Sequence, residues 1–353
     1  MKIFSGLSYL EKLFFIKHLS MFLKSGIPLD EALETLAEGE QKSSISKVAL
    51  SVRAQIQNGQ PLHKAFAKES SSFDLFFISM VEIGEVSGTL EKSLDFLVAK
   101  ITREATLRKK IQAMLYYPAV VVGAAIVIGG FVSFFVLPKL GDMFKSFDVQ
   151  LPLITRILLA FANWVKDYGA IAMISFIALL IVFRVLIAAW TRLRFFWHKI
   201  KFNLPITGKV ILGSELSAFF RNIGIMLSSG LSLEYALATE SKISDNLVMK
   251  KVAADLHMAV TQGRRMGEEL KSENNTIFPQ LCARMITVGE MSGKLEESCM
   301  YLADYFEDET EVQAKNMAAI LEPALLLGIG AIVAFIAMAV ILPIYSLTGS
   351  IRR

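Results

Sequence analysis

Few residues of this 353-residue sequence have the type and spacing that chemistry needs. Cys282 and Cys299 are its only thiols, which could form a disulfide or take part in redox chemistry. No phosphate-binding loop, zinc-protease signature or nucleophile elbow occurs. The histidines, which show no metal-ligand spacing, are His18, His63, His198 and His257. We therefore expect no catalytic residues, no metal, no cofactor and no enzyme activity.

One polar motif, in contrast, is written twice. Residues 81–91 read VEIGEVSGTLE, and residues 287–296 read TVGEMSGKLE. The repeated positions are Gly84, Glu85, Ser87, Gly88 and Leu90 in the first copy and Gly289, Glu290, Ser292, Gly293 and Leu295 in the second. Further matches upstream, from Phe15 with Phe219 onward, keep the same order and nearly the same spacing. The chain therefore contains a duplicated unit.

The repeated motif has two interpretations. It can be a corner between helices, where the first glycine allows close backbone approach, the second ends a helix, and the leucine turns into the core. Alternatively, Glu85 and Glu290 form a polar patch for a partner. We favour the corner, because it explains the glycines and a docking patch does not.

The repeat also assigns the two cysteines. With the spacing that relates Gly84 to Gly289, Cys282 falls opposite Phe77 and Cys299 opposite Leu94. Small apolar side chains are typical of core positions, and free cysteine is among the most buried residue types. We expect both thiols to fill the core.

The composition indicates a membrane protein. The chain is 54% hydrophobic and 20% charged, with a net charge of only +4, and no basic run indicates nucleic acid binding. Residues 111–138 and 323–350 lack Asp, Glu, Lys and Arg, and each can span a bilayer as a helix. A third apolar run, 169–190, contains a single charged residue, Arg184. Four prolines mark the span boundaries: Pro118, Pro138, Pro323 and Pro343.

Basic clusters set the predicted orientation. One precedes the first span (Lys100 to Lys110) and one follows the middle span (Arg192 to Lys201). Such clusters favour the cytoplasmic side, so we expect the N-terminus and both soluble units in the cytoplasm and the C-terminus outside. The middle span has no counterpart in the repeat, and it returns the chain to the cytoplasm for the second unit.

The predicted fold is an all-α membrane protein: two homologous cytoplasmic six-helix bundles in tandem repeat, with three transmembrane helices. The predicted segments are a first bundle (1–110), a first transmembrane helix (111–138), an extracytoplasmic loop with an amphipathic helix (139–168), a second transmembrane helix (169–190), a second bundle (191–320), a third transmembrane helix (321–346) and a short extracytoplasmic tail (347–353). The amphipathic helix either lies on the outer membrane surface or lengthens the middle span.

The two bundles carry unlike charges next to their spans. The second has an acidic run, Glu307 to Glu311, where the first has Arg103, Arg108 and Lys109. The simpler interpretation is two solvated helix faces. The alternative is that acidic and basic regions pair between the bundles or between copies, which favours a homo-oligomer.

These motifs resemble those of the inner-membrane platform proteins of type IV pilus and type II secretion machines. The resemblance rests on the duplicated G-E-x-S-G-x-L, on Tyr117-Pro118, and on residues 321–323 (LEP) with 342–345 (LPIY). It covers essentially the whole chain.

The resemblance implies a platform protein in the cytoplasmic membrane. Its expected partners are a hexameric cytoplasmic assembly ATPase, pilin or pseudopilin subunits, other inner-membrane assembly proteins and the lipid bilayer. The platform would couple the ATPase to insertion of subunits into a filament. The alternatives are a small polytopic channel or transporter, or a membrane scaffold unrelated to filaments.

Overall fold

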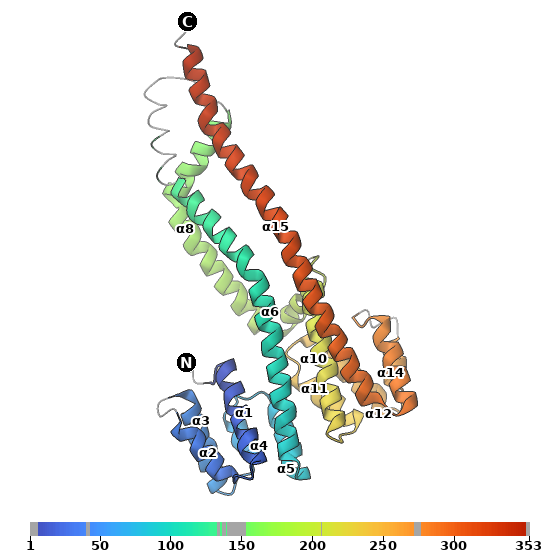
Figure 1. The fold of residues 1–353 in the computed structure, drawn as a ribbon. Coiled ribbons are helices and arrows are strands. Elements are labelled where there is room, and N and C mark those ends of the chain that lie inside the picture. The colour runs from blue at the N-terminus through green and yellow to red at the C-terminus, as the bar shows by residue number, and fades with distance from the viewer. Residues whose placement is uncertain are drawn as a thin grey trace. The chain divides into compact units, whose positions relative to one another are not determined.

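The computed structural model describes residues 6–39, 43–132, 135, 139, 153–205, 207–271 and 277–350. Within these ranges every regular element is a helix and no strand occurs, which confirms the all-α fold class (Figure 1). The chain divides into two compact units. One comprises residues 1–110 and 198–313, and the other comprises residues 111–197 and 314–353.

The first helical module begins with five short helices and ends in a long one. Their bounds are α1 Tyr9–Lys24, α2 Leu29–Glu38, α3 Ser44–Gln57, α4 Leu62–Lys68, α5 Leu75–Ser87 and α6 Leu90–Phe131. Side-chain oxygens of Ser8, Ser43 and Asp74 accept hydrogen bonds from backbone N–H groups in the first turns of α1, α3 and α5. Gly26 and Gly59, both at positive φ, follow the ends of α1 and α3.

The second module repeats this order of elements. Its bounds are α10 Gly208–Ser228, α11 Leu233–Ile243, α12 Leu247–Thr261, α13 Met266–Leu270, α14 Gln280–Ser292 and α15 Leu295–Ser350. Gly230 and Gly263, which occupy the equivalent positions after α10 and α12, also have a positive φ, as Gly26 and Gly59 do. The duplicated sequence therefore folds twice into the same succession of six helices.

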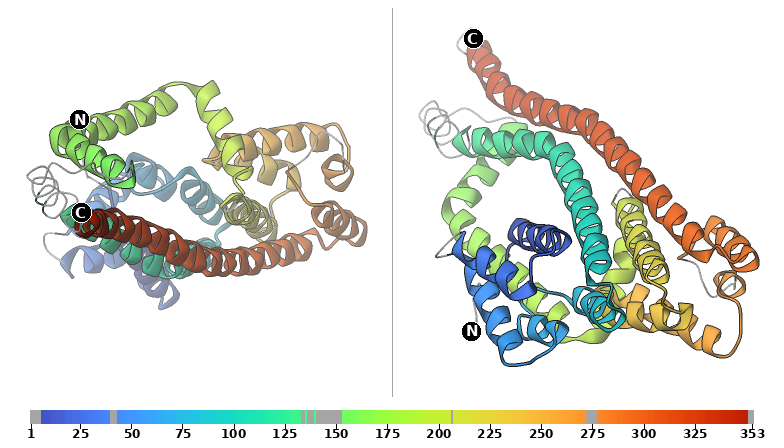
Figure 2. Two further views of the ribbon diagram at one scale, coloured as in Figure 1. Left: turned by 90° about the horizontal axis from the view of Figure 1, so that it is seen from above. Right: turned by 60° about the horizontal axis from the view of Figure 1, so that its bottom comes forward.

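Two boundaries predicted from the sequence fall inside helices. The boundaries at residues 110 and 320 lie within α6 and α15, each of which is one uninterrupted ribbon in Figure 2. The sixth helix of each module and the span after it are thus one element. At residue 110 the reason is local, because no glycine, asparagine or proline occurs between residues 100 and 117. α15, in contrast, continues as a helix through Asn316 and Pro323.

The segment between the modules is also more helical than predicted. α8, Leu153–Ala189, contains both the predicted amphipathic helix and the predicted middle span. α9, Thr191–Phe202, was not predicted. In the unit that holds α8, the Thr155 hydroxyl donates to the Ala339 carbonyl of α15 at 2.8 Å.

Four described helices are long and apolar enough to cross a membrane, one more than the three predicted spans. The additional one is α10. Its apolar window is 67% buried among the helices of the modules, against 6% or less for the windows in α6, α8 and α15. α10 therefore has its apolar surface covered by protein, whereas the other three expose theirs, as lipid-facing helices do.

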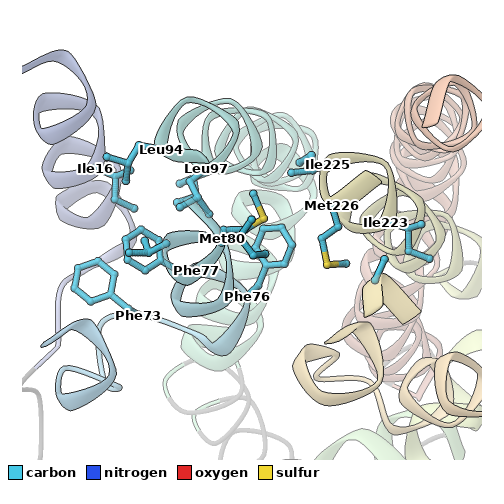
Figure 3. Close-up of a cluster of buried hydrophobic side chains, with 14 of the residues drawn as sticks. Ile16, Phe73, Phe76, Phe77, Met80, Leu94, Leu97, Ile223, Ile225 and Met226 are labelled. Carbon is cyan, nitrogen blue, oxygen red and sulfur yellow. The ribbon is translucent and has the colours of Figure 1, made fainter. Parts of the chain in front are cut away.

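The two modules share one continuous hydrophobic core. Figure 3 shows Phe76 and Met80 of α5 on the side of the first module that faces Ile225 and Met226 of α10. All four side chains are at most 4% exposed. The cores of the two modules have thus merged, and α5 packs against α11 as well.

Candidate functional site

The repeated motif forms the same corner in both modules. α5 ends at Ser87 and α14 at Ser292, and the glycine that follows each takes a left-handed conformation, with φ 67° at Gly88 and 70° at Gly293. The next backbone N–H donates back to the first motif glycine, from Thr89 to Gly84 at 2.8 Å and from Lys294 to Gly289 at 2.9 Å. This six-to-one bond satisfies carbonyls at the helix end and turns the chain into the next helix.

The first glycine of each copy lies where two helices touch. A Cβ on Gly84 would come within 2.6 Å of Ser93 Oγ and 2.8 Å of Leu90 Cα. A Cβ on Gly289 would come within 2.5 Å of Ser298 Oγ. α5 with α6, and α14 with α15, can approach this closely only because these positions have no side chain.

The repeated glutamate caps a neighbouring helix of its own module. The Glu85 carboxylate accepts backbone N–H bonds from Leu62 at 2.7 Å and His63 at 3.2 Å. In the second module Glu290 accepts from Met266 at 2.7 Å and Gly267 at 3.0 Å. These donors are the first residues of α4 and α13, which have no side-chain cap of their own. A carboxylate there satisfies orphan N–H groups and complements the helix dipole.

Glu85 has one more partner than Glu290. His63 Nδ1 lies 2.7 Å from its carboxylate. Burial raises the pKa of Glu85, but the His63 side-chain hydrogen bond and the two backbone bonds outweigh it, and the net pKa is lowered. The glutamate is therefore held in the ionised form that the helix N-terminus prefers.

The remaining motif residues have local roles. Ser87 and Ser292 donate to the carbonyls of Ile83 and Val288 in the preceding turn, at 2.7 and 2.8 Å. Leu90 and Leu295 begin α6 and α15 and pack against the shared core. The solvent-facing position lies between the glutamate and the serine, where Val86 is 82% and Met291 73% exposed.

Three of the four prolines are in the described residues, and none of these three marks a helix end. Pro118 lies inside α6, and Pro323 and Pro343 lie inside α15; Pro138 lies outside the described residues. Proline within a helix removes one backbone hydrogen bond, which membrane helices tolerate better than soluble ones because neighbouring groups satisfy the freed carbonyl.

Acidic and basic side chains pair between α6 and α15 within one chain. Arg103 pairs with Asp304, and Lys110 with Glu311 at 2.6 Å. Arg221 of α10, whose side chain is only 6% exposed, pairs with Asp304 at 2.9 Å and also with Glu307. From the sequence, pairing between the bundles was the alternative to the simpler interpretation of two solvated faces. Arg221 and Asp304 were missed, because they lie outside the runs of like charge.

Both thiols fill the core, as the repeat indicates. Cys282 and Cys299 are unpaired and fully buried, and so are their counterparts Phe77 and Leu94. Burial raises the pKa of both thiols to about 12, which makes them poor nucleophiles at neutral pH. Among the described residues, no group of three or more His, Cys, Asp or Glu side chains could hold a metal ion.

A comparison with known proteins also finds the duplication. The family described as "Type II secretion system (T2SS), protein F" matches the chain twice, at residues 15–138 and 219–343. The type IV pilus assembly protein TapC of Aeromonas hydrophila is 25% identical over 94% of this chain and 80% of its own length. The type II secretion system protein F of Pseudomonas aeruginosa is 28% identical over 97% and 84%. PilC of Myxococcus xanthus, a type IV pilus assembly protein, is 26% identical over 99% and 83%.

Proposed function

Because the chain belongs to the type II secretion system protein F family, we propose that it is the inner-membrane platform of a type IV pilus or type II secretion machine. In this role it couples a cytoplasmic hexameric assembly ATPase to the insertion of pilin or pseudopilin subunits into a filament. The observation that carries the proposal is the family match to each of two modules, each ending in a helix that continues into an apolar span.

The proposed topology follows from charge and parity. The basic residues before the span of α6 and after that of α8 favour the cytoplasmic side. α8 supplies the crossing that brings the chain back between the two outgoing helices. Both modules and the N-terminus then lie in the cytoplasm, and the C-terminus lies outside.

The architecture of the modules supports a mechanical role. No nucleotide-binding loop is present in the sequence, so energy has to come from a partner. The shared core and the ion pairs of Arg103 and Lys110 join the modules through α6 and α15, the two helices that continue into spans. A displacement of the modules would therefore reach the spans through continuous helices. We place partner contacts at the exposed Val86 and Met291, since Glu85 and Glu290 have partners within the chain.

Co-purification tests the platform function. The full chain in detergent is tested for capture of an assembly ATPase from the same organism. Deletion of the gene for this chain is scored for surface filaments or secreted protein. The platform function predicts a complex and loss of the filament or of secretion. Absence of a complex together with intact filaments and secretion would contradict it.

A channel or transporter is the rival class. It predicts solute flux in proteoliposomes that hold this chain alone, and the platform function predicts none. The three exposed apolar helices favour the platform, because a transport pathway usually needs more spans and polar groups at mid-depth.

A further inference from the structure

A polar cavity lies between the two modules, in the unit that holds both. Its volume is about 330 Å³, and its walls come from α5 and α6 on one side and from α10, α11 and the start of α12 on the other. Five of its lining residues are acidic and one is basic: Asp74, Glu104, Glu215, Glu240 and Asp245, against Lys100. None of these residues belongs to the repeated motif.

Glu240 is an exception to the duplication. The segment 29–36 reads LDEALETL and 233–240 reads LEYALATE, so Glu240 takes the place of Leu36. Both side chains are buried, Leu36 at 5% and Glu240 at 3% exposure. Burying a carboxyl group where the sister module buries a leucine costs free energy that packing does not return. A ligand that interacts with the carboxylate would offset that cost.

Asn222 provides the second observation. It lines the same cavity, is 8% exposed, and donates through Nδ2 to Glu240 at 3.0 Å. Its Oδ1 is the one buried side-chain N or O atom among the described residues without a hydrogen-bond partner. Buried acceptors in native proteins are nearly always satisfied, so this carbonyl calls for a donor.

Several of the acidic side chains that line the cavity already have a partner within the chain. Asp74 pairs with Lys12 at 2.7 Å, and Lys100 pairs with Glu104 and lies over the Phe76 ring. Glu215 accepts from Asn246 at 3.1 Å. The polar side chains of the lining are these five carboxylates, Lys100, Asn222 and the hydroxyls of Ser214 and Ser244. Beside them lie apolar walls that include Phe76 and Phe219.

We propose that this cavity binds a small aliphatic amine, such as a diamine, whose ammonium group donates to Glu240 and to the Asn222 carbonyl. An ammonium group has three donors and no acceptor, which matches this pair of residues. The methylene chain suits the Phe76 and Phe219 walls, and an ammonium can also lie over an aromatic ring. The inference does not depend on the platform function, because it concerns the purified chain alone.

Calorimetric titration of the detergent-purified full chain with 1,4-diaminobutane tests this proposal. Ionic strength is constant, and the pH is 8 because burial raises the pKa of Glu240 to about 7. We expect saturable binding with one site per chain and a higher melting temperature. Glu240→Gln should weaken binding roughly tenfold or more. Glu240→Leu, which copies the sister module, should abolish binding and raise the melting temperature without ligand. Glu31→Gln on the exposed face of α2 is the matched control and should bind as wild type does.

Three results would overturn the proposal. The first is an equal effect of tetramethylammonium, which has no N–H donor. The second is unchanged binding by Glu240→Gln. The third is a response to Ca²⁺ in place of the amine. Since Glu240→Leu fills the position with the residue of the first module, a correctly folded control is available if Glu240→Gln fails to fold. None of these results involves the ATPase or the filament, so failure here leaves the platform function untouched.

Discussion

The Glu85 carboxylate accepts a hydrogen bond from the backbone N–H of Leu62 at 2.7 Å, and so joins the corner after α5 to the start of α4. Glu290 makes the equivalent bond to Met266, also at 2.7 Å. The glutamate therefore makes the same hydrogen bonds within both modules, and each module needs it for its own fold. The repeated glutamates are thus helix caps, and their carboxylates have a structural role in the motif.

Removing either cap should destabilise its module. Glu85→Ala and Glu290→Ala each leave two first-turn N–H groups without their acceptor, and loss of a helix cap costs about 1–2 kcal/mol. Glu85→Ala should cost more, because the His63 hydrogen bond is lost as well. Thermal unfolding of the full chain in detergent measures both. Asp255→Ala, which removes an exposed acidic residue from the middle of α12, is the control for general loss of negative charge.

The two glycines of the corner should respond differently to the same substitutions. Gly88 has free space around it but a φ of 67°, so Gly88→Val should cost roughly 1–3 kcal/mol through strain. Gly88→Asn should cost much less, because asparagine tolerates the left-handed region. At Gly84 a Cβ meets Ser93 and Leu90, so Gly84→Asn should be at least as damaging as Gly84→Ala. Equal melting temperatures for Gly88→Val and wild type would contradict the corner geometry.

The sequence predicted these corners because their signal is local and repeated. A glycine after a helical segment, found at the same place twice, has few interpretations other than a turn. The cap partners of Glu85 could not be predicted, because α4 is brought beside α5 by packing and not by spacing. The only hint was that the glutamate occurs in both copies.

The continuation of α6 and α15 through the predicted boundaries at residues 110 and 320 could not be predicted for a different reason, although the compact units do divide at residue 110. Composition changes there from polar to apolar, while the backbone remains helical through α6 and α15. The cavity residues Glu240 and Asn222 were also missed, although the alignment of Glu240 with Leu36 is visible in the sequence. The position is found by comparing where the two copies differ, whereas the repeated motif is found where they agree.

Glu240 should make stability depend on pH near neutrality. Burial raises the pKa of Glu240 to about 7 in the folded chain, from the ordinary glutamate value of 4.5. The folded state therefore binds this proton more tightly than the unfolded state does. The resulting stability is fully present below about pH 4.5 and is lost as the pH rises toward 7, by up to roughly 3 kcal/mol. Unfolding of wild type and Glu240→Gln between pH 5 and 8 measures it, and equal slopes for the two would contradict the burial of this carboxyl group.

The ion pairs between α6 and α15 can be tested by swapping the charges of the two partners. Lys110→Glu or Glu311→Lys places like charges together and should lower the melting temperature, and the double swap should restore most of the loss. The hydrogen bond to Glu311 raises the pKa of Lys110, so Lys110 is charged throughout the neutral range. High salt should reduce the difference between the variants. Lys294→Glu is a matched control, since Lys294 pairs only locally with Glu297 of α15.

Site-specific labelling tests most directly the central claim that both modules lie on one side of the membrane. Gln60→Cys and Gln262→Cys place an exposed thiol beyond α3 and α12 respectively, while the native thiols stay buried. In intact spheroplasts a membrane-impermeant maleimide should label neither residue, and in lysed cells it should label both. Asp148→Cys, in the loop predicted to be outside, is the positive control. Labelling of one module and not the other in intact spheroplasts would contradict the account.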